Sequence, residues 1–200
     1  MKIVVLGPDG AGKSSVINGI LGQLNSGGRA VKVRHLKPSL AFPRRGNAGG
    51  IVVDPHGKPP RSALVSVAKI LVWLGEEWYA TLFQDKKGEL LICDRYYHDL
   101  LVDSRRYRYG GPRWIASWIG SLMPRPRLWL LLDAPAEVLQ SRKQEVTPEE
   151  TERQRQAYLD FVRTRRNYAV IDASQALNKV VADAEKAIAG ALVEGENDHG

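Results

Sequence analysis

The first fifteen residues constrain the fold more than any other part of the sequence. An apolar run, Ile3–Leu6, leads directly into Gly7-Pro8-Asp9-Gly10-Ala11-Gly12-Lys13-Ser14, which matches the spacing G-x-x-x-x-G-K-S/T at every fixed position. A helix-like stretch begins at Ser15. Between a strand and a helix, glycines let backbone amides turn inward onto phosphate oxygens, and the positive end of the helix faces the same anion. The spacing therefore predicts a nucleotide-binding loop.

Individual residues of this loop have expected tasks. Lys13 would reach the β and γ phosphates of a nucleotide, and the hydroxyl of Ser14 would ligate Mg²⁺. The residues predicted to contact the nucleotide are Gly7, Asp9, Gly10, Ala11, Gly12, Lys13, Ser14 and Ser15.

A second feature with chemical meaning follows the apolar run Leu90–Cys93, where the chain continues with Asp94 and Arg95. An acid at the carboxyl end of a strand beside a phosphate loop can hold Mg²⁺ through water. A guanidinium next to it can grip a phosphate with two parallel hydrogen bonds. Asp94 and Arg95 are therefore predicted catalytic residues, and the alternatives are a cap or turn for Asp94 and a surface salt bridge for Arg95.

A third feature is an apolar run, Leu128–Leu132, that feeds a short helix ending in Arg142. Phosphoryl transfer spreads negative charge over the migrating group, and an arginine carried by a lid can stabilise that charge. Arg142 is the predicted lid residue, on a short lid over residues 142–147. Arg153 and Arg155 are the second choices, because a helix with alternating charges is usually a solvated face.

The pattern of apolar runs predicts an α/β fold with a parallel sheet. Five short runs without polar alternation suit strands that are covered on both faces, and the stretches between them are long enough for helical crossovers. The runs are Ile3–Leu6, Val31–Val33, Leu90–Cys93, Leu128–Leu132 and Ala169–Ile171. Two hundred residues, 44% of them hydrophobic and 26% charged, fit one globular domain with helices on both faces of the sheet.

Three helical stretches are recognisable. Apolar residues follow two stripes from Leu64 to Leu82, which predicts a largely buried helix. A cap sequence at 147–150 predicts a helix start, and another helix is expected from Ser174, before a flexible tail at 194–200. Trp114 and Trp118 lie four residues apart, which indicates a core face first and a homodimer face second.

The charge balance favours anionic ligands. Basic residues outnumber acidic ones by 29 to 22, a net charge of +7, and they concentrate between residues 29 and 61 and in Arg105, Arg106, Arg108 and Arg113. Arginines beside tyrosines could stack on nucleic acid, but the stretch is short for an extended groove. A single cysteine, Cys93, and an N-terminal apolar run too short for a signal peptide or a membrane span predict a cytoplasmic protein.

Together, the glycine loop, Asp94-Arg95-Tyr96, and Leu132-Asp133-Ala134-Pro135 with the trailing Arg142-Lys143 resemble the thymidylate kinase-like branch of the nucleoside monophosphate kinases. The resemblance covers nearly the whole chain. It implies a three-layer P-loop kinase domain at 1–193, with sheet order 2-3-1-4-5 and an acceptor-binding insertion at about 36–62. It also implies ATP with Mg²⁺ as the donor, Arg95 on the acceptor phosphate, Asp9 near the acceptor's sugar hydroxyl, and a homodimer as a common assembly.

The acceptor stays open at this point. The family usually has a Ser and an Ala-Tyr-Gln stretch after Asp-Arg-Tyr that help to read thymine, whereas this chain has Tyr97-His98-Asp99-Leu100. Thymidylate is the leading specific prediction, and a sugar or phosphosugar is the alternative acceptor. A nucleotide-binding regulator without transfer activity is another alternative, as is a GTP switch suggested by Asp54-Pro55-His56-Gly57.

Overall fold

The structure is a computed structural model that describes residues 1–26, 30–35, 59–85 and 89–197. The chain divides into two compact units. Unit 1 contains residues 1–35, 86–96 and 126–200, and unit 2 contains residues 36–85 and 97–125. Unit 2 is thus larger than the insertion predicted at 36–62, of which residues 36–58, with the Asp54–Gly57 motif, lie outside the described residues.

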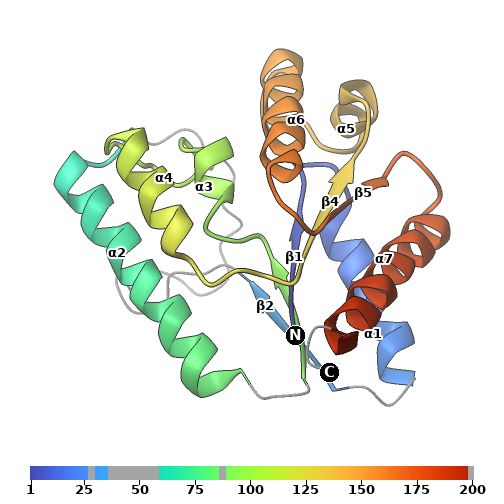
Figure 1. Ribbon diagram of the computed structural model, residues 1–200. Helices are drawn as coiled ribbons and strands as arrows, with labels where there is room; N and C mark the ends of the chain where they lie inside the picture. Colours follow the sequence, from blue (N-terminus) through green and yellow to red (C-terminus); the bar gives the residue numbers. More distant parts are fainter. Residues whose placement is uncertain (27–29, 36–58, 86–88, 198–200) are drawn as a thin grey trace, which may run out of the picture. The chain divides into compact units, whose positions relative to one another are not determined.

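Unit 1 is built on one parallel five-stranded sheet (Figure 1). The order β2-β3-β1-β4-β5 is the one that the family resemblance implied, and each of the five predicted apolar runs lies in a strand. The strands are β1 (Lys2–Leu6), β2 (Val31–His35), β3 (Leu90–Asp94), β4 (Leu128–Asp133) and β5 (Tyr168–Asp172). The predicted α/β class and sheet order are therefore confirmed.

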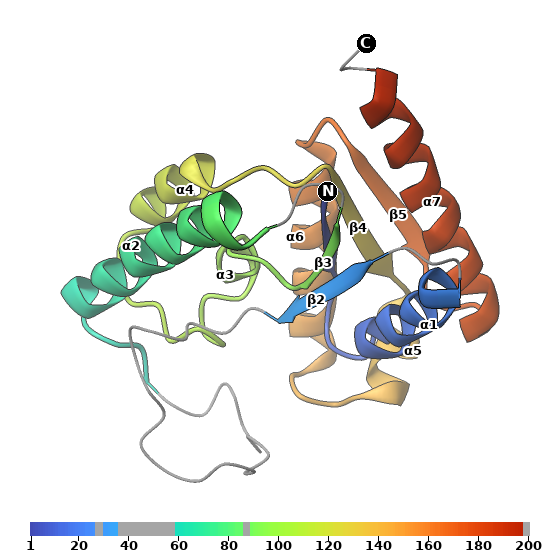
Figure 2. The ribbon, with the colours of Figure 1, turned by 90° about the horizontal axis from the view of Figure 1, so that it is seen from below.

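Helices cover both faces of this sheet (Figure 2). They are α1 (Lys13–Ser26), α5 (Ala136–Arg142), α6 (Pro148–Arg163) and α7 (Leu177–Asn197). On one face, buried residues of α1 and α7 such as Ile20 and Ala184 join the core formed by Ile3 and alternate strand residues. On the other face the Trp129 ring lies edge-on to Phe161 of α6, with 5.1 Å between the ring centroids. This double coverage explains why the strands carry no polar alternation.

The termini of α6 and α7 follow local side-chain chemistry. Thr147 caps α6 as predicted, because its side chain accepts a hydrogen bond from the Glu150 amide at 3.3 Å. Helix α7 begins at Leu177 rather than near Ser174, since the Asp172 carboxylate accepts the Ser174 amide at 2.9 Å and holds a turn there. The tail predicted from residue 194 is helical as far as Asn197, and residues 198–200 lie outside the described residues.

Unit 2 is a helical unit. It contains α2 (Ala63–Tyr79), which continues as a π-helical turn, η1 (Ala80–Gln84), then α3 (Asp99–Val102) and α4 (Arg113–Leu122). The buried Trp73 ring packs edge-on against Tyr97 and Tyr107, at centroid distances of 6.0 and 5.5 Å. Nε2 of the buried His98 lies 3.0 Å from the Gly120 carbonyl oxygen. Aromatic packing and buried hydrogen bonds therefore hold this unit together.

The burial predicted for two apolar helices is wrong. Leu64 and Leu82 of α2 and η1 are 86% and 65% exposed, and Trp114 and Trp118 of α4 are 71% and 59% exposed. Unit 2 instead buries the opposite side of α2, which carries Ile70 and Trp73. Among the described residues, none of the helices combines the length and apolarity that crossing a membrane requires.

Candidate functional site

The loop that follows β1 turns tightly at its glycines. Gly10 has φ of +85°, and a Cβ built on it would lie 2.4 Å from the Leu139 carbonyl oxygen. A Cβ on Gly7 would lie 2.6 Å from the carbonyl oxygen of Leu132. Side chains are therefore excluded at both positions by sterics, and the loop leads directly into the N-terminus of α1, where backbone amides can bind an anion.

Lys13 is buried and directed into its own loop. Its ammonium donates hydrogen bonds to the carbonyl oxygens of Gly7 at 2.7 Å and Pro8 at 2.8 Å. The side chains of Ser14 and Ser15, one and two residues further, are exposed. The loop therefore holds a cation in its interior and presents hydroxyl groups at its surface, which suits an anion with a bound metal.

The sheet brings the second predicted feature to the same place. β1 pairs in parallel with β3, and Val5 lies opposite Asp94 in that register. The Arg95 amide then donates to the Val5 carbonyl at 3.1 Å. Because parallel neighbours end at the same edge, the loop after β1 and the Asp94-Arg95 pair share the carboxyl edge of the sheet, where ligands of such sheets bind.

Arg95 is linked directly to the loop. Its guanidinium forms an ion pair with Asp9 at 2.7 Å and contacts the Tyr158 hydroxyl of α6 at 3.5 Å. The side chains of Arg95 and Asp9 are only 16% and 12% exposed. Arg95 also has φ of +66°, a left-handed conformation that is costly for a residue with a Cβ. Packing around the site thus holds the arginine in a strained position.

Asp94 has the chemistry expected of a metal ligand. One carboxylate oxygen lies 2.9 Å from His35 Nδ1, at the end of the neighbouring strand β2. The other oxygen, Oδ1, is buried and has no hydrogen-bond partner among the residues that the structure describes. A buried carboxylate oxygen without a partner is energetically unfavourable unless a cation or water completes it. Asp94 and the exposed Ser14 hydroxyl therefore fit Mg²⁺, whose remaining ligands would be water and phosphate oxygens.

The described residues contain no alternative metal centre. In the parts of the chain that the structure describes, no three His, Cys, Asp or Glu side chains gather closely enough to hold an ion. Any metal at this edge of the sheet would depend on oxygen ligands such as those of Asp94 and Ser14, which favours a hard cation.

The second-choice lid arginines are engaged by carboxylates. Arg155 of α6 grips Asp133, at the end of β4, with two hydrogen bonds of 2.9 and 3.0 Å. This pairing raises the pKa of Arg155 above its usual value. Arg153 contacts both carboxylate oxygens of Glu150 at 2.7 Å. Neither arginine lies in the predicted lid at 142–147, which connects α5 to α6.

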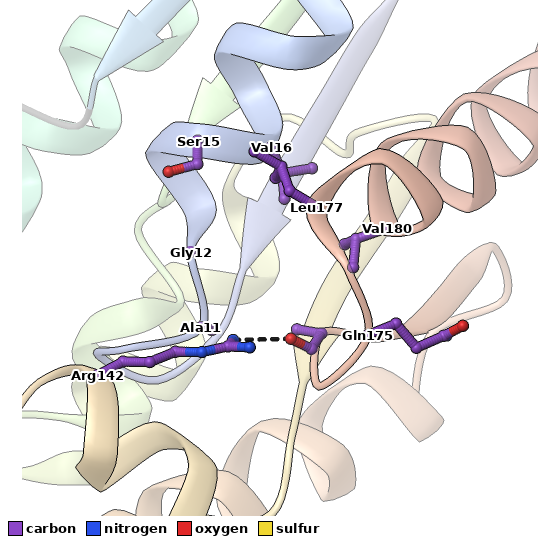
Figure 3. Close-up of a pocket in the computed structure, with 9 residues that line it drawn as sticks. Ala11, Gly12, Ser15, Val16, Arg142, Gln175, Leu177 and Val180 are labelled. Atoms are coloured by element: carbon purple, nitrogen blue, oxygen red, sulfur yellow. Dashed lines mark hydrogen bonds between the residues drawn. The ribbon is translucent and has the colours of Figure 1, made fainter.

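Arg142 lines a cavity beside the glycine loop that follows β1 (Figure 3). Its guanidinium donates to the Ala173 carbonyl at 2.7 Å, just after β5. The cavity, of about 210 Å³, is lined by Ala11, Gly12, Ser15, Val16, Arg142, Ala173, Gln175, Leu177 and Val180. It combines an apolar side from α1 and α7 with a cationic side from α5, and it is small enough to favour one ring system over a whole nucleotide.

Several site residues were not anticipated from the sequence. His35, Tyr158 and Asp133 contact residues that the sequence did predict, which are Asp94, Arg95 and the second-choice Arg155, respectively. Asp133 could have been found, since it ends an apolar run as Asp94 does and the carboxyl ends of parallel strands meet at one edge. Tyr158 left no such signal, because only tertiary packing brings α6 to Arg95.

Comparison with protein-family models and curated proteins finds no relative. No model of a protein family matches the chain, and no curated protein is significantly similar to it. The functional argument therefore depends on the geometry described above.

Proposed function

We propose that this protein transfers a phosphoryl group from ATP to a small anionic acceptor, with Mg²⁺. Thymidylate, as in the thymidylate kinase-like family that the sequence resembles, is the leading acceptor, and a sugar or phosphosugar is the alternative. The main support is the meeting of three features at one sheet edge: the glycine loop with buried Lys13, the unpartnered Asp94 oxygen, and Arg95.

On the donor side, the loop amides and Lys13 would bind the phosphates. Lys13 would exchange the carbonyl oxygens of Gly7 and Pro8 for phosphate oxygens, which are stronger acceptors for a cation. The cavity next to the loop would take the base, with Leu177 on its apolar side and the Arg142 guanidinium against a ring face. Arg142 would thus orient the donor, in place of the lid role expected from the sequence.

On the acceptor side, Arg95 would bind the anionic group. Its guanidinium now faces Asp9, so an arriving acceptor would compete with that carboxylate for the same nitrogen atoms. The strained backbone of Arg95 fixes the direction in which its side chain leaves the chain. This favours a single position for the acceptor, in line with the transferred phosphoryl group. Mg²⁺, held by Ser14 and Asp94, would neutralise charge on the donor phosphates when bound.

A regulator that binds nucleotide without transferring phosphate would use the same loop. The unpartnered Asp94 oxygen favours an enzyme, because a binding-only loop has less need of a carboxylate aimed at a metal. The two functions differ in turnover, so a direct assay separates them.

The test is an ADP-release screen of the purified protein with Mg-ATP and a panel of acceptors, which includes nucleoside monophosphates and phosphosugars. We expect release that depends on one acceptor and disappears in Lys13→Ala. Lys32→Ala, which changes a partly exposed lysine of β2, is the matched control and should retain activity. ATP binding by the wild type without turnover of any acceptor would favour the regulator instead.

A further inference from the structure

Unit 2 gathers three basic side chains around one buried aromatic cluster. Lys69 lies on the second turn of α2, Arg61 precedes that helix, and Arg108 lies in the loop between α3 and α4. The Arg61 amide donates to the Arg108 carbonyl at 3.0 Å, so the two chain segments are in direct contact. The site in unit 1 uses none of these residues.

Lys69 occupies an aromatic and cationic environment. Its ammonium lies 4.8 Å from the centre of the Trp73 ring and donates to the Tyr107 carbonyl at 3.2 Å. Among the described residues, no carboxylate forms an ion pair with it. The buried carboxylate of Asp99 instead accepts the Tyr107 hydroxyl at 2.7 Å.

Arg108 is held in place at some cost. Its backbone has φ of +53°, a conformation that disfavours residues with a Cβ. Its Nε donates to the Pro59 carbonyl at 3.0 Å, the one acceptor that its guanidinium has among the described residues. The next segment is fitted closely against it, because a Cβ on Gly110 would lie 2.1 Å from the Arg61 carbonyl oxygen. Sterics and backbone hydrogen bonds therefore determine the position of this arginine.

This arrangement opposes the charge on Lys69. Burial, and then the positive charges of Arg61 and Arg108, lower the pKa of Lys69 to about 8. Like charges brought together in a partly buried place destabilise the folded state unless an anion neutralises them. A fold that holds them there by strained and tightly packed backbone is better explained by a ligand than by stability.

We infer that Lys69 and Arg108, joined to the segment of Arg61 by a backbone hydrogen bond, form a binding site for the phosphate group of a small molecule. A phosphomonoester carries a charge of about −1.5 to −2 near pH 7 and offers three acceptor oxygens, which suits the ammonium of Lys69 and the guanidinium of Arg108. A carboxylate would leave more of the positive charge uncompensated. This site belongs to unit 2 alone and does not depend on the proposed kinase activity.

The site can be tested by phosphate binding to the full-length chain. Lys13→Ala serves as the background, because it weakens the competing phosphate loop. NMR of protein labelled at the lysine side chains would follow Lys69, whose signal is assigned by its loss in Lys69→Met. We expect inorganic phosphate at millimolar concentration to shift the Lys69 signal and to raise its titration midpoint above 8, since a bound anion favours the ammonium form.

Two arginine variants make the test specific. Arg108→Gln should weaken phosphate binding by about tenfold or more, as expected for a lost charge-assisted hydrogen bond. Arg105→Gln removes the same charge from an exposed position in the same loop and should change affinity by less than about twofold. An unchanged Lys69 signal with phosphate, or equal weakening by both variants, would overturn the inference.

A second ligand identifies the source of the phosphate. If ribose 5-phosphate binds more tightly than inorganic phosphate, the site reads a phosphate monoester. Equal affinities would assign it to free phosphate. Whichever of the two ligands binds more tightly, binding that is weakened by Arg108→Gln supports the site. The measurement does not require catalytic turnover.

Discussion

At position 95 a strained backbone and a nearly buried charge coincide. The φ of +66° costs roughly 1–2 kcal/mol for any residue with a Cβ, and the guanidinium is paired with Asp9. Tight packing normally removes such strain unless the position of the side chain matters. The contributions of the backbone strain and of the ion pair can be separated by substitution. Both glycine and alanine remove the ion pair, but only glycine relieves the strain of the left-handed backbone.

We therefore expect Arg95→Ala to lower the free energy of unfolding by about 3 kcal/mol through loss of the largely buried ion pair. Arg95→Gly loses the same pair and relieves the strain, so it should be about 0.5 kcal/mol or more stable than Arg95→Ala. Urea unfolding of both variants measures the difference. Both should also raise the KM for the acceptor while ATP affinity is retained. An alanine variant more stable than the glycine variant would contradict the backbone argument.

Arg142 offers a second prediction at this scale. If its guanidinium orients the base of ATP from the cavity wall, Arg142→Ala should raise the KM for ATP by about tenfold and leave kcat within a few-fold. Arg142→Lys keeps the charge without the planar face, so its KM for ATP should lie between those of the wild type and Arg142→Ala. A kcat lowered by 10³–10⁵ at unchanged KM would instead assign Arg142 to the transferring group. Steady-state kinetics with varied ATP distinguishes these outcomes.

At the scale of elements, α6 contacts the carboxyl ends of two strands of the sheet, β3 and β4. It carries Arg155, which grips Asp133 at the end of β4, and Tyr158, which contacts Arg95 after β3. Its start is set by Thr147 and not by either of these contacts. The position of the cap therefore determines where along the sheet edge both side chains lie.

Removing this cap should weaken the helix without touching the site. Thr147→Ala is expected to lower the free energy of unfolding by about 1 kcal/mol, because the Glu150 amide loses its side-chain acceptor. Thr147→Ser keeps the hydroxyl and should retain most of the stability. Denaturant unfolding of the two variants provides the measurement. Equal losses in both would mean that the methyl group of Thr147, and not its oxygen, stabilises the helix start.

Elements were predicted well where one local signal decides them. Apolar runs without polar alternation identified all five strands, and the cap chemistry at Thr147 identified the start of α6. The start of α7 was missed because the Asp172 carboxylate competes for the amides near Ser174. The cavity was out of reach, since it needs Arg142 and Leu177 to meet through tertiary packing. Helix periodicity likewise could not show which side of α2 is buried in unit 2.

At the scale of the whole molecule, the exposed stripe of α2 calls for a partner. Leu64, Leu71, Trp78 and Leu82 are 86%, 49%, 44% and 65% exposed, and the small residues Ala68 and Gly75 lie between them. The spacing alternates four and three residues, the period at which two helices pack along a shared seam. The neighbouring side chains of Tyr79 and Phe83 are 55% and 73% exposed and extend this apolar surface.

We expect a homodimer in which this stripe packs against its own copy. Leu71→Glu places a charge in the middle of the seam and should convert the dimer to a monomer at micromolar concentration. Gln84→Glu adds the same charge at an exposed position outside the stripe and should leave the dimer intact. Sedimentation velocity reports both. A wild-type chain that stays monomeric at tens of micromolar would exclude this assembly.

Helix α5 has a consequence for how a ligand is sensed. Its Leu139 carbonyl occupies the space that a Cβ on Gly10 would need, and Arg142, one turn later, forms part of the cavity wall. Helix α5 has seven residues, so both contacts lie within about two helical turns. If a ligand ring in the cavity displaced Arg142 and tilted α5, the Leu139 carbonyl would move relative to Gly10. The space around the Gly10 backbone would then change as well. A ligand in the cavity and the backbone of the glycine loop are therefore coupled through α5.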